Sequence, residues 1–370
     1  MKIPLVDLYA QYVSIKPEID SAIASVIKQT AFIGGSFVTD FERDFAKSYG
    51  VKHVVGCGNG TDSLYVLMRM MGIGAGDEVI TAANSWISSS ETITQTGAKP
   101  VFVDVHPEYH SMDESKLEAK ITRATKAVIA VHLQGQMCDI ESIKKTCDKH
   151  KLFLIEDCAQ SHFSEFKGKR AGLFGNAGSF SFYPGKNLGA YGDAGCIITN
   201  DDVLGEKCRM YSHHGSLKKH QHRMEGINSR LDGLQAAILS AKLPFLTEWI
   251  EKRIQAAALY DKWLTGIPGI ILPKQRPGTK HTWHLYVIRC GQRQRLAEYL
   301  SERGIETAVH YPVALPNLSV YRYLGYKTSD FPVATELQDE ILSLPIFPEL
   351  TEEMIAFVAD STRSFFASLF

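Results

Sequence analysis

Residues 178–196 read GSFSFYPGKNLGAYGDAGC, and they place a single lysine, Lys186, on a turn. A short alternating run ends at Pro184-Gly185, and small residues surround the lysine until the apolar run Cys196–Thr199 begins. An amine with little bulk around it and no neighbouring carboxylate suits a nucleophile that forms a Schiff base with a carbonyl cofactor. A solvated lysine in a glycine-rich loop is equally compatible with this stretch taken alone.

A second stretch lies twenty-nine residues upstream, where the apolar run Leu152–Ile155 is followed by Glu156 and Asp157. The run predicts a buried parallel strand, and open α/β sheets bind their ligands at the carboxyl ends of such strands. Pyridoxal phosphate needs a carboxylate beside its ring nitrogen, which keeps that nitrogen protonated. Asp157 fits this role, and Gln160 could hydrogen-bond the ring hydroxyl.

Together, the segments EDCAQSH (156–162) and SFSFYPGKNLGAYGDAG (179–195) resemble the DegT–StrS family of pyridoxal-phosphate-dependent sugar-nucleotide aminotransferases. The resemblance runs from Val6-Asp7-Leu8 to Ser343–Ile346. It implies an α/β, fold-type-I architecture with a mainly parallel seven-stranded sheet covered by helices. We expect residues 1–245 to form the large cofactor-binding domain, with an N-terminal helical segment, and residues 246–370 a smaller C-terminal α+β domain.

The order of strand-like and helix-like segments along the chain agrees with such a sheet. Apolar runs alternate with helical patterns, which is typical of a mainly parallel, doubly covered sheet. The strands that we predict are Glu78–Ala82, Pro100–Val105, Ala127–His132, Leu152–Ile155, Ser179–Phe182 and Cys196–Thr199, and in the C-terminal part His281–Arg289. Helices are predicted at Ile15–Ile27, Val38–Tyr49, from Leu64 onward, through Leu246–Leu259 and at Leu296–Arg303.

A glycine-rich turn, Gly58-Asn59-Gly60-Thr61-Asp62, joins a short strand that starts at His53 to a helix. Free amides and the helix dipole favour an anion at such a turn. A plain turn with Thr61 or Asp62 as the N-cap is the alternative. The dinucleotide fingerprint Gly-x-Gly-x-x-Gly is missing at this turn, and the Walker pattern is missing at Gly185-Lys186 because Asn187 follows. The family resemblance assigns the cofactor phosphate to this turn.

The resemblance implies further contacts. Trp86 would lie against the pyridine ring, although a tryptophan taken alone more often packs in the core. Asn228 would reach the cofactor phosphate across a dimer interface, so we expect a homodimer with shared active sites. The cofactor-binding residues so implied are Gly60, Thr61, Asp62, Trp86, Asp157, Gln160, Ser181, Lys186 and Asn228, and Lys186 is also the catalytic residue.

The basic stretch Met210–Gly226, which contains Lys218 and Lys219, is either a flexible loop or a segment that covers the neighbouring subunit's site, where it would suit a diphosphate. Tyr183, Arg230, His310 and Tyr311 are the candidate substrate residues. The expected partners are L-glutamate, as amino donor, and a nucleotide-linked keto-deoxysugar. In this reaction Lys186 would move a proton as general base and then acid.

Regiochemistry depends on the segment 310–316, which reads HYPVALP. Relatives that aminate C-4 often carry Tyr-Pro-x-Pro-Leu-His, and this chain departs from that pattern at Ala314 and Pro316. The segment resembles enzymes that aminate C-3 of a dTDP-linked 3-keto-6-deoxyhexose for glycan or natural-product glycosylation. Amination of C-4 of a UDP- or dTDP-4-keto-6-deoxyhexose is the alternative, because Pro316 could reflect loop packing alone. The nucleotide carrier and the sugar configuration stay open.

Composition, net charge and cysteine spacing limit which partners and cofactors the protein can bind. The 370 residues are 45% hydrophobic and 22% charged, with a net charge of −1, so the molecule as a whole offers no field that attracts nucleic acid or a membrane surface. The seven cysteines contain no Cys-x-x-Cys pair, and we expect reduced thiols and no metal. Without a signal peptide or a long apolar run, a cytoplasmic protein is expected.

Two other functions are alternatives to a sugar aminotransferase. One is a dehydratase-like relative, in which the lysine is replaced, and the other is a non-catalytic cofactor-binding regulator.

Overall fold

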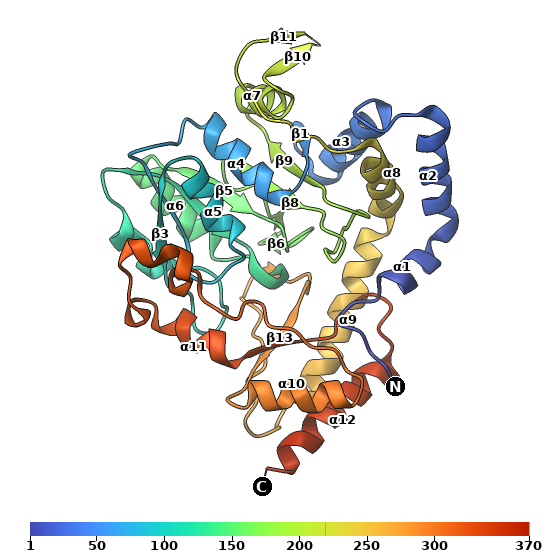
Figure 1. Ribbon diagram of the computed structural model, residues 1–370. Coiled ribbons are helices and arrows are strands. Elements are labelled where there is room, and N and C mark those ends of the chain that lie inside the picture. The colour runs from blue at the N-terminus through green and yellow to red at the C-terminus, as the bar shows by residue number, and fades with distance from the viewer. Residues whose placement is uncertain (219, 370) are drawn as a thin grey trace.

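A seven-stranded sheet forms the centre of the protein (Figure 1). The computed structural model describes residues 1–218 and 220–369, so Lys219 of the basic stretch lies outside the described residues. All neighbouring strands pair in parallel except β9, which runs antiparallel to both of its neighbours. In spatial order the strands are β1 (His53–Cys57), β9 (Gly195–Thr199), β8 (Ala177–Ser181), β5 (Phe153–Asp157), β4 (Thr125–Val131), β2 (Glu78–Ala82) and β3 (Lys99–Val103). The predicted seven-stranded, mainly parallel sheet is confirmed.

Helices cover both faces of this sheet. On one face, Phe41 and Phe45 of α3 pack in the same core as the buried strand residue Phe180. On the other, Leu64 and Leu67 of α4 pack with strand residues such as Val55 and Ile129. Burial on both faces explains why the strands read as continuous apolar runs. The helices of this part are α1 (Leu8–Ser14), α2 (Lys16–Gln29), α3 (Ser36–Tyr49), α4 (Gly60–Met70), α5 (Ser88–Gln95), α6 (Ile140–His150), α7 (Asp202–Ser212) and α8 (Gly233–Lys242).

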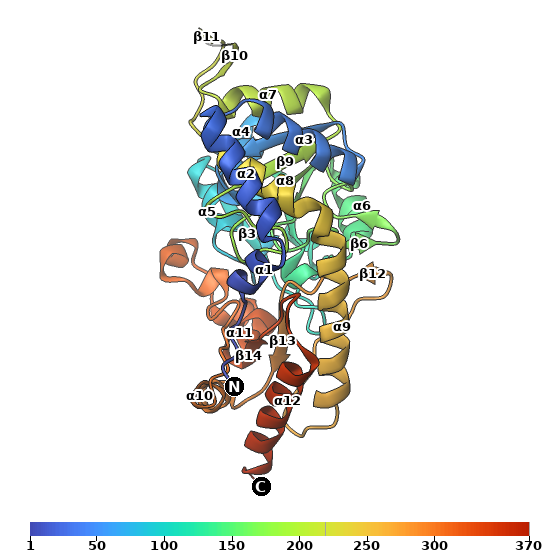
Figure 2. The same cartoon turned by 90° about the vertical axis from the view of Figure 1, so that its right-hand side faces the viewer.

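A second core gathers the C-terminal elements. The long helix α9 (Leu246–Leu264) leads away from α8 toward this part of the molecule (Figure 2). Tyr260, Tyr286 and Val358 are buried in this core, and Ile3 of the N-terminus joins it through a parallel bridge to Ile305. The remaining elements are α10 (Arg293–Glu302), α11 (Pro332–Glu340), α12 (Glu352–Ala367), and the antiparallel pair β13 (Tyr286–Arg289) and β14 (Ile341–Leu344).

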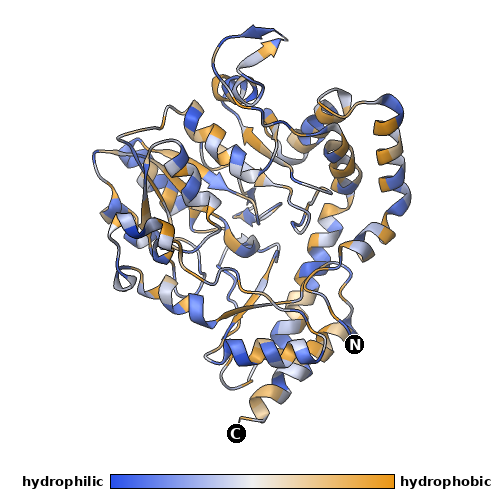
Figure 3. Cartoon of the chain, in the orientation of Figure 1, coloured by the Kyte–Doolittle hydropathy of each residue, from blue (hydrophilic) through white to orange (hydrophobic). Residues whose placement is uncertain are grey.

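The helices alternate polar and apolar residues along their length, as expected for helices with one buried face (Figure 3). No helix in the described ranges combines the length and the apolar character of a membrane span.

Short elements complete the fold: β6 (Glu165–Phe166), β7 (Lys169–Arg170), β10 (Ser216–Lys218), β11 (Gln221–His222), β12 (Thr279–Lys280) and the 3-10 turns η1 (Glu114–Lys116), η2 (Glu118–Lys120), η3 (Leu133–Gly135), η4 (Leu243–Phe245), η5 (Leu315–Asn317), η6 (Ser319–Leu324) and η7 (Thr328–Asp330).

One predicted strand was wrong. The strand predicted at His281–Arg289 begins only at Tyr286, because Trp283 has a positive φ of 45° and the Thr282 amide donates to the carbonyl of Gly135. Residues 282–285 are therefore hydrogen-bonded to the η3 turn, which comes after strand β4, and β13 starts only after them. The basic stretch is not simply a loop, since it contains the two-stranded β10–β11 hairpin that projects beyond α7.

Candidate active site

A cavity of about 550 Å³ opens at the carboxyl ends of β4 and β5, between the sheet and the C-terminal elements. Residues far apart in sequence line it, from Leu5 near the N-terminus to Ile346. Most of the sequence-predicted site residues lie in its wall: Gly60, Thr61, Trp86, Asp157, Gln160, Ser181, Tyr183, Lys186, His310 and Tyr311. The sequence motifs therefore converge on a single cavity.

Lys186 lies on a tight loop after β8. Its amide donates to the carbonyl of Tyr183 at 2.8 Å, and the Ala190 amide donates to Phe182 at 2.8 Å. Only glycine fits at Gly189, because a Cβ atom there would lie 2.2 Å from the carbonyl oxygen of Pro184. Burial lowers the pKa of the Lys186 amine from 10.5 to about 8, although the attraction of Asp157 acts in the opposite direction.

Asp157 is the last residue of β5 and is buried. One carboxylate oxygen accepts a hydrogen bond from Ser89 Oγ at 3.1 Å, and the other accepts from the Ala159 amide at 3.1 Å. Burial raises the pKa of Asp157, and these two hydrogen bonds and the charge of Lys186 partly offset that effect. The carboxylate is thus held in one orientation at the floor of the cavity.

An aromatic wall faces this floor. Trp86 is 56% exposed, which excludes the alternative that it packs in the core, and its ring centroid lies 5.4 Å from that of Tyr311. The Tyr311 hydroxyl accepts from Gln160 Nε2 at 2.9 Å, while Gln160 Oε1 accepts from the Gln134 amide at 2.6 Å. Beside them His310 lies with Nδ1 2.8 Å from Ser343 Oγ, and burial lowers its pKa to about 4, so the imidazole is neutral.

The N-terminus of α4 forms another part of the wall. Asn59 is the N-cap, with Oδ1 accepting from the Asp62 amide at 2.7 Å, so the alternative with Thr61 or Asp62 as the cap is wrong. Gly60 approaches β8 so closely that a Cβ atom would lie 2.7 Å from the Cβ of Ser181. Thr61 and Ser88 share a hydrogen bond of 2.7 Å between their hydroxyls. The turn thus presents small groups and a helix N-terminus to the cavity.

Asp62, Asn228 and Arg230 do not line the cavity. Asp62 accepts a hydrogen bond of 2.6 Å from Ser229 Oγ, which also accepts from the Gly58 amide at 3.0 Å. Asp62 therefore ties the turn to the loop that carries the other two residues. Asn228 is exposed and Arg230 half-buried, so both are accessible from outside this chain.

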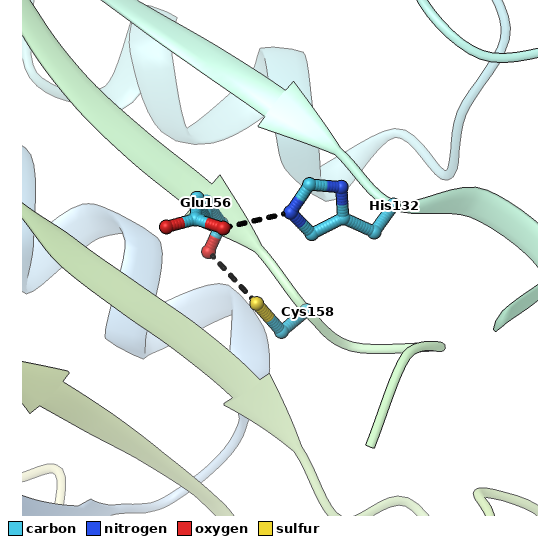
Figure 4. A group of neighbouring side chains, drawn as sticks. All are labelled: His132, Glu156 and Cys158. Atoms are coloured by element: carbon cyan, nitrogen blue, oxygen red, sulfur yellow. Dashed lines mark hydrogen bonds and ion pairs between the residues drawn. The ribbon is translucent and has the colours of Figure 1, made fainter. Parts of the chain in front are cut away.

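A buried polar cluster lies behind the site, where His132, Glu156 and Cys158 approach one another (Figure 4). Their donor atoms are close enough to share a metal ion, but hydrogen bonds within the protein already engage them. His132 Nε2 lies 2.9 Å from Glu156 Oε2, and the Cys158 thiol donates to the Glu156 carbonyl at 3.6 Å. The carboxylate also accepts from the amides of Gly172, Phe174 and Gly175. Glu156 therefore fixes the loop between β7 and β8.

Sequence reasoning missed several residues of the site, of which Arg253 and His284 line the cavity and Ser89 lies buried behind Asp157. Arg253 belongs to a regular helical pattern on α9, and His284 follows an apparent strand pattern, so neither carries a local signal. Ser89, which orients Asp157, is one of three consecutive serines. The composition around these residues gives no reason to single them out. Only the three-dimensional arrangement brings them to the site.

The model of the DegT/DnrJ/EryC1/StrS aminotransferase family matches residues 13–363. The chain belongs to this family. It is 45% identical to a protein named "Pleiotropic regulatory protein" of Geobacillus stearothermophilus, with 99% of each chain covered. It is 41% identical to the dTDP-3-amino-3,6-dideoxy-alpha-D-galactopyranose transaminase of Aneurinibacillus thermoaerophilus, covering 98% of this chain and 99% of that protein.

A solved relative with the same fold is DesV of S. venezuelae in complex with a ketimine intermediate. Its TM-score is 0.96 at 38% identity, and the match covers 99% of this chain and 98% of that one. This aminotransferase family thus accounts for the architecture of nearly the whole chain.

Proposed function

We propose that the protein is a pyridoxal-phosphate-dependent aminotransferase that moves an amino group from L-glutamate to C-3 of a dTDP-linked 3-keto-6-deoxyhexose. The observation that carries the proposal is the pairing, in one cavity, of an amine with a lowered pKa and a fixed buried carboxylate, Lys186 and Asp157. Perturbed groups of complementary charge in a cleft are typical of catalytic sites. The family match and the named transaminase relatives support the same reaction class.

The lining residues fit pyridoxal phosphate. Gly60 lets the N-terminus of α4 lie directly against Ser181 of β8, and a helix N-terminus favours an anion, with Thr61 and Ser181 lining the same cavity. We assign the ring nitrogen to Asp157 and the ring face to Trp86, because the first is a buried anion and the second an exposed aromatic side chain. When bound, the cofactor accepts the electrons released as the bond between the substrate carbon and its proton breaks.

Lys186 transfers the proton in this reaction, and Asp157 stabilises the charge on the cofactor. With a pKa of about 8, roughly a tenth of the Lys186 amines are neutral at pH 7, so Nζ can take a proton from the donor's α-carbon and later return it. Asp157 stabilises positive charge at the cofactor nitrogen, because its carboxylate is held in place before the reaction begins. The neutral His310 adds no competing charge beside the amine.

We assign Asn228 to the site of a second copy. Its exposure outside the cavity of its own chain, on a loop tied to the α4 turn by Ser229, supports a role in trans. On this assignment the functional unit is a homodimer. Asn228 bridges to His213, which precedes the basic hairpin, and the positive charge of Arg230 and of this hairpin would suit the diphosphate of the sugar nucleotide.

Two alternatives have specific support. Amination at C-4 stays open because the segment 310–316 differs from the C-4 pattern by only a few residues. A regulatory protein without catalysis is favoured by the name of the 45% identical relative. The relatives named as transaminases, at 41% and 38% identity, argue for catalysis, since a regulator that binds the same cofactor would also use the Lys186 amine.

The deciding experiment supplies the purified protein with L-glutamate and with 3-keto and 4-keto 6-deoxyhexoses linked to dTDP or UDP. We expect an amine at C-3 of the dTDP sugar, located by NMR, and no product from a Lys186→Ala variant. Exclusive C-4 amination would overturn the regiochemistry. No amination of any sugar by the wild-type protein would favour the regulator.

A further inference from the structure

The cavity contains a second cation besides Lys186. Among the described residues that line it, Lys186 and Arg253 are the only lysine or arginine side chains. Arg253 comes from α9, and it lines the cavity together with the C-terminal residues His284, Leu344 and Ile346. Those residues are separate from the α4 turn that we assign to the cofactor phosphate. This cation therefore needs an explanation of its own.

Arg253 is 3% exposed, and only part of its guanidinium group is hydrogen-bonded. Nη1 donates to the carbonyl oxygens of Ile346 at 2.8 Å and Trp283 at 3.2 Å. Nε is buried without a partner. Within the part of the chain that the structure describes, no carboxylate oxygen lies within 4.0 Å of the group, and Glu349 attracts it only from farther away.

Burial lowers the pKa of Arg253 to about 10, so the side chain keeps its charge at neutral pH. The neighbouring histidines are neutral, because burial lowers the pKa of His310 to about 4 and that of His284 well below its usual value. Backbone carbonyls satisfy one nitrogen of Arg253 but carry no net charge. A buried cation in this position is costly unless an anion pairs with it.

The structure assigns Arg253 as the residue that binds a carboxylate group of the amino donor. This inference rests on the proposed function and deepens it, since it names the contact that selects an amino acid as donor. Guanidinium and carboxylate groups match in charge and geometry, and the apolar side chains of Leu285, Leu344 and Ile346 shield the pair from water. The keto-6-deoxyhexose itself has no carboxylate, and we assign the diphosphate of its nucleotide to Arg230 and the basic hairpin, so Arg253 is assigned to the donor half of the reaction and not to the sugar half.

The test compares the two half-reactions of the holoenzyme, each followed by the absorbance of the bound cofactor. In Arg253→Gln, we expect kcat/KM for L-glutamate to fall at least about 30-fold, as for the loss of a charge-assisted hydrogen bond. The half-reaction with the dTDP-3-amino-6-deoxyhexose product should stay within about threefold. Arg253→Lys keeps the charge and should recover part of the glutamate activity. Arg276, another buried arginine that lies outside the cavity, provides the matched control as Arg276→Gln.

A binding measurement complements the kinetics. Glutarate, a dicarboxylate without an amine, should bind the wild-type holoenzyme in a calorimetric titration and should lose most of its affinity in Arg253→Gln but not in Arg276→Gln. Equal losses in both half-reactions, or unchanged glutarate binding, would show that Arg253 only supports the fold. If the wild-type protein converts no amino sugar, the proposed function fails, and the glutarate titration alone then decides for or against this carboxylate site.

Discussion

The pKa of Lys186 offers a direct test of the site, and the change to make is Asp157→Asn. In the cofactor-free protein the amine should titrate near pH 8 instead of 10.5. At pH 7 the neutral fraction is then about 9%, compared with about 0.03% for an ordinary lysine, a difference of roughly 300-fold. Asp157 attracts the ammonium form and raises the pKa, so its replacement by a neutral amide should move the titration below pH 8.

The assay is trace acylation of the cofactor-free protein between pH 6 and pH 10, with the Lys186 peptide quantified by mass spectrometry. Reactivity follows the neutral amine, so its midpoint reports the pKa. The control variant Asp339→Asn removes an exposed carboxylate from α11, outside the cavity, and should leave the midpoint in place. A wild-type midpoint above pH 10 would refute the effect of burial on this amine, and an upward shift in Asp157→Asn would refute the attraction between the two side chains.

Three further predictions concern catalysis, assembly and stability. In the loaded enzyme, Asp157→Asn should keep the cofactor but lower turnover by more than about tenfold, and a loss below tenfold, about 1.4 kcal/mol, would contradict the assigned role. Mixed dimers of Lys186→Ala and Asn228→Ala subunits should regain activity that neither variant has alone, whereas inactive verified heterodimers would exclude a shared site. Glu156→Ala leaves three backbone amides and His132 without their acceptor, and should cost at least about 3 kcal/mol. The exposed Glu298→Ala is its control, and the loss is measured as a lower thermal unfolding midpoint.

Much of the candidate site could be predicted because its signals are local. Lys186 and Asp157 belong to segments whose composition alone indicates a glycine-rich turn and the end of a buried strand, and the structure places both in the cavity. The boundaries of the strands predicted for the large sheet also hold to within a few residues, since an apolar run buried on both faces leaves little freedom. Their catalytic roles stay predictions until the variants are measured.

The choice between packing alternatives could not be made from sequence. An exposed tryptophan and a core tryptophan look alike in a chain, and only the contact of Trp86 with Tyr311, more than two hundred residues later, distinguishes them. The strand pattern at His281–Arg289 failed for a related reason, because hydrogen bonds of Thr282 and Leu285 to the η3 loop override the local preference.

The sequence by itself determined the sheet, the lysine turn and the carboxylate at the strand end, because these depend on residues that are neighbours in the chain. The tertiary structure alone decided that Arg253 faces the same cavity as Lys186 and that no carboxylate of the described chain lies within ion-pair distance of it. The charge balance of a cavity depends on side chains that long-range packing brings together. No pattern of neighbouring residues encodes that balance.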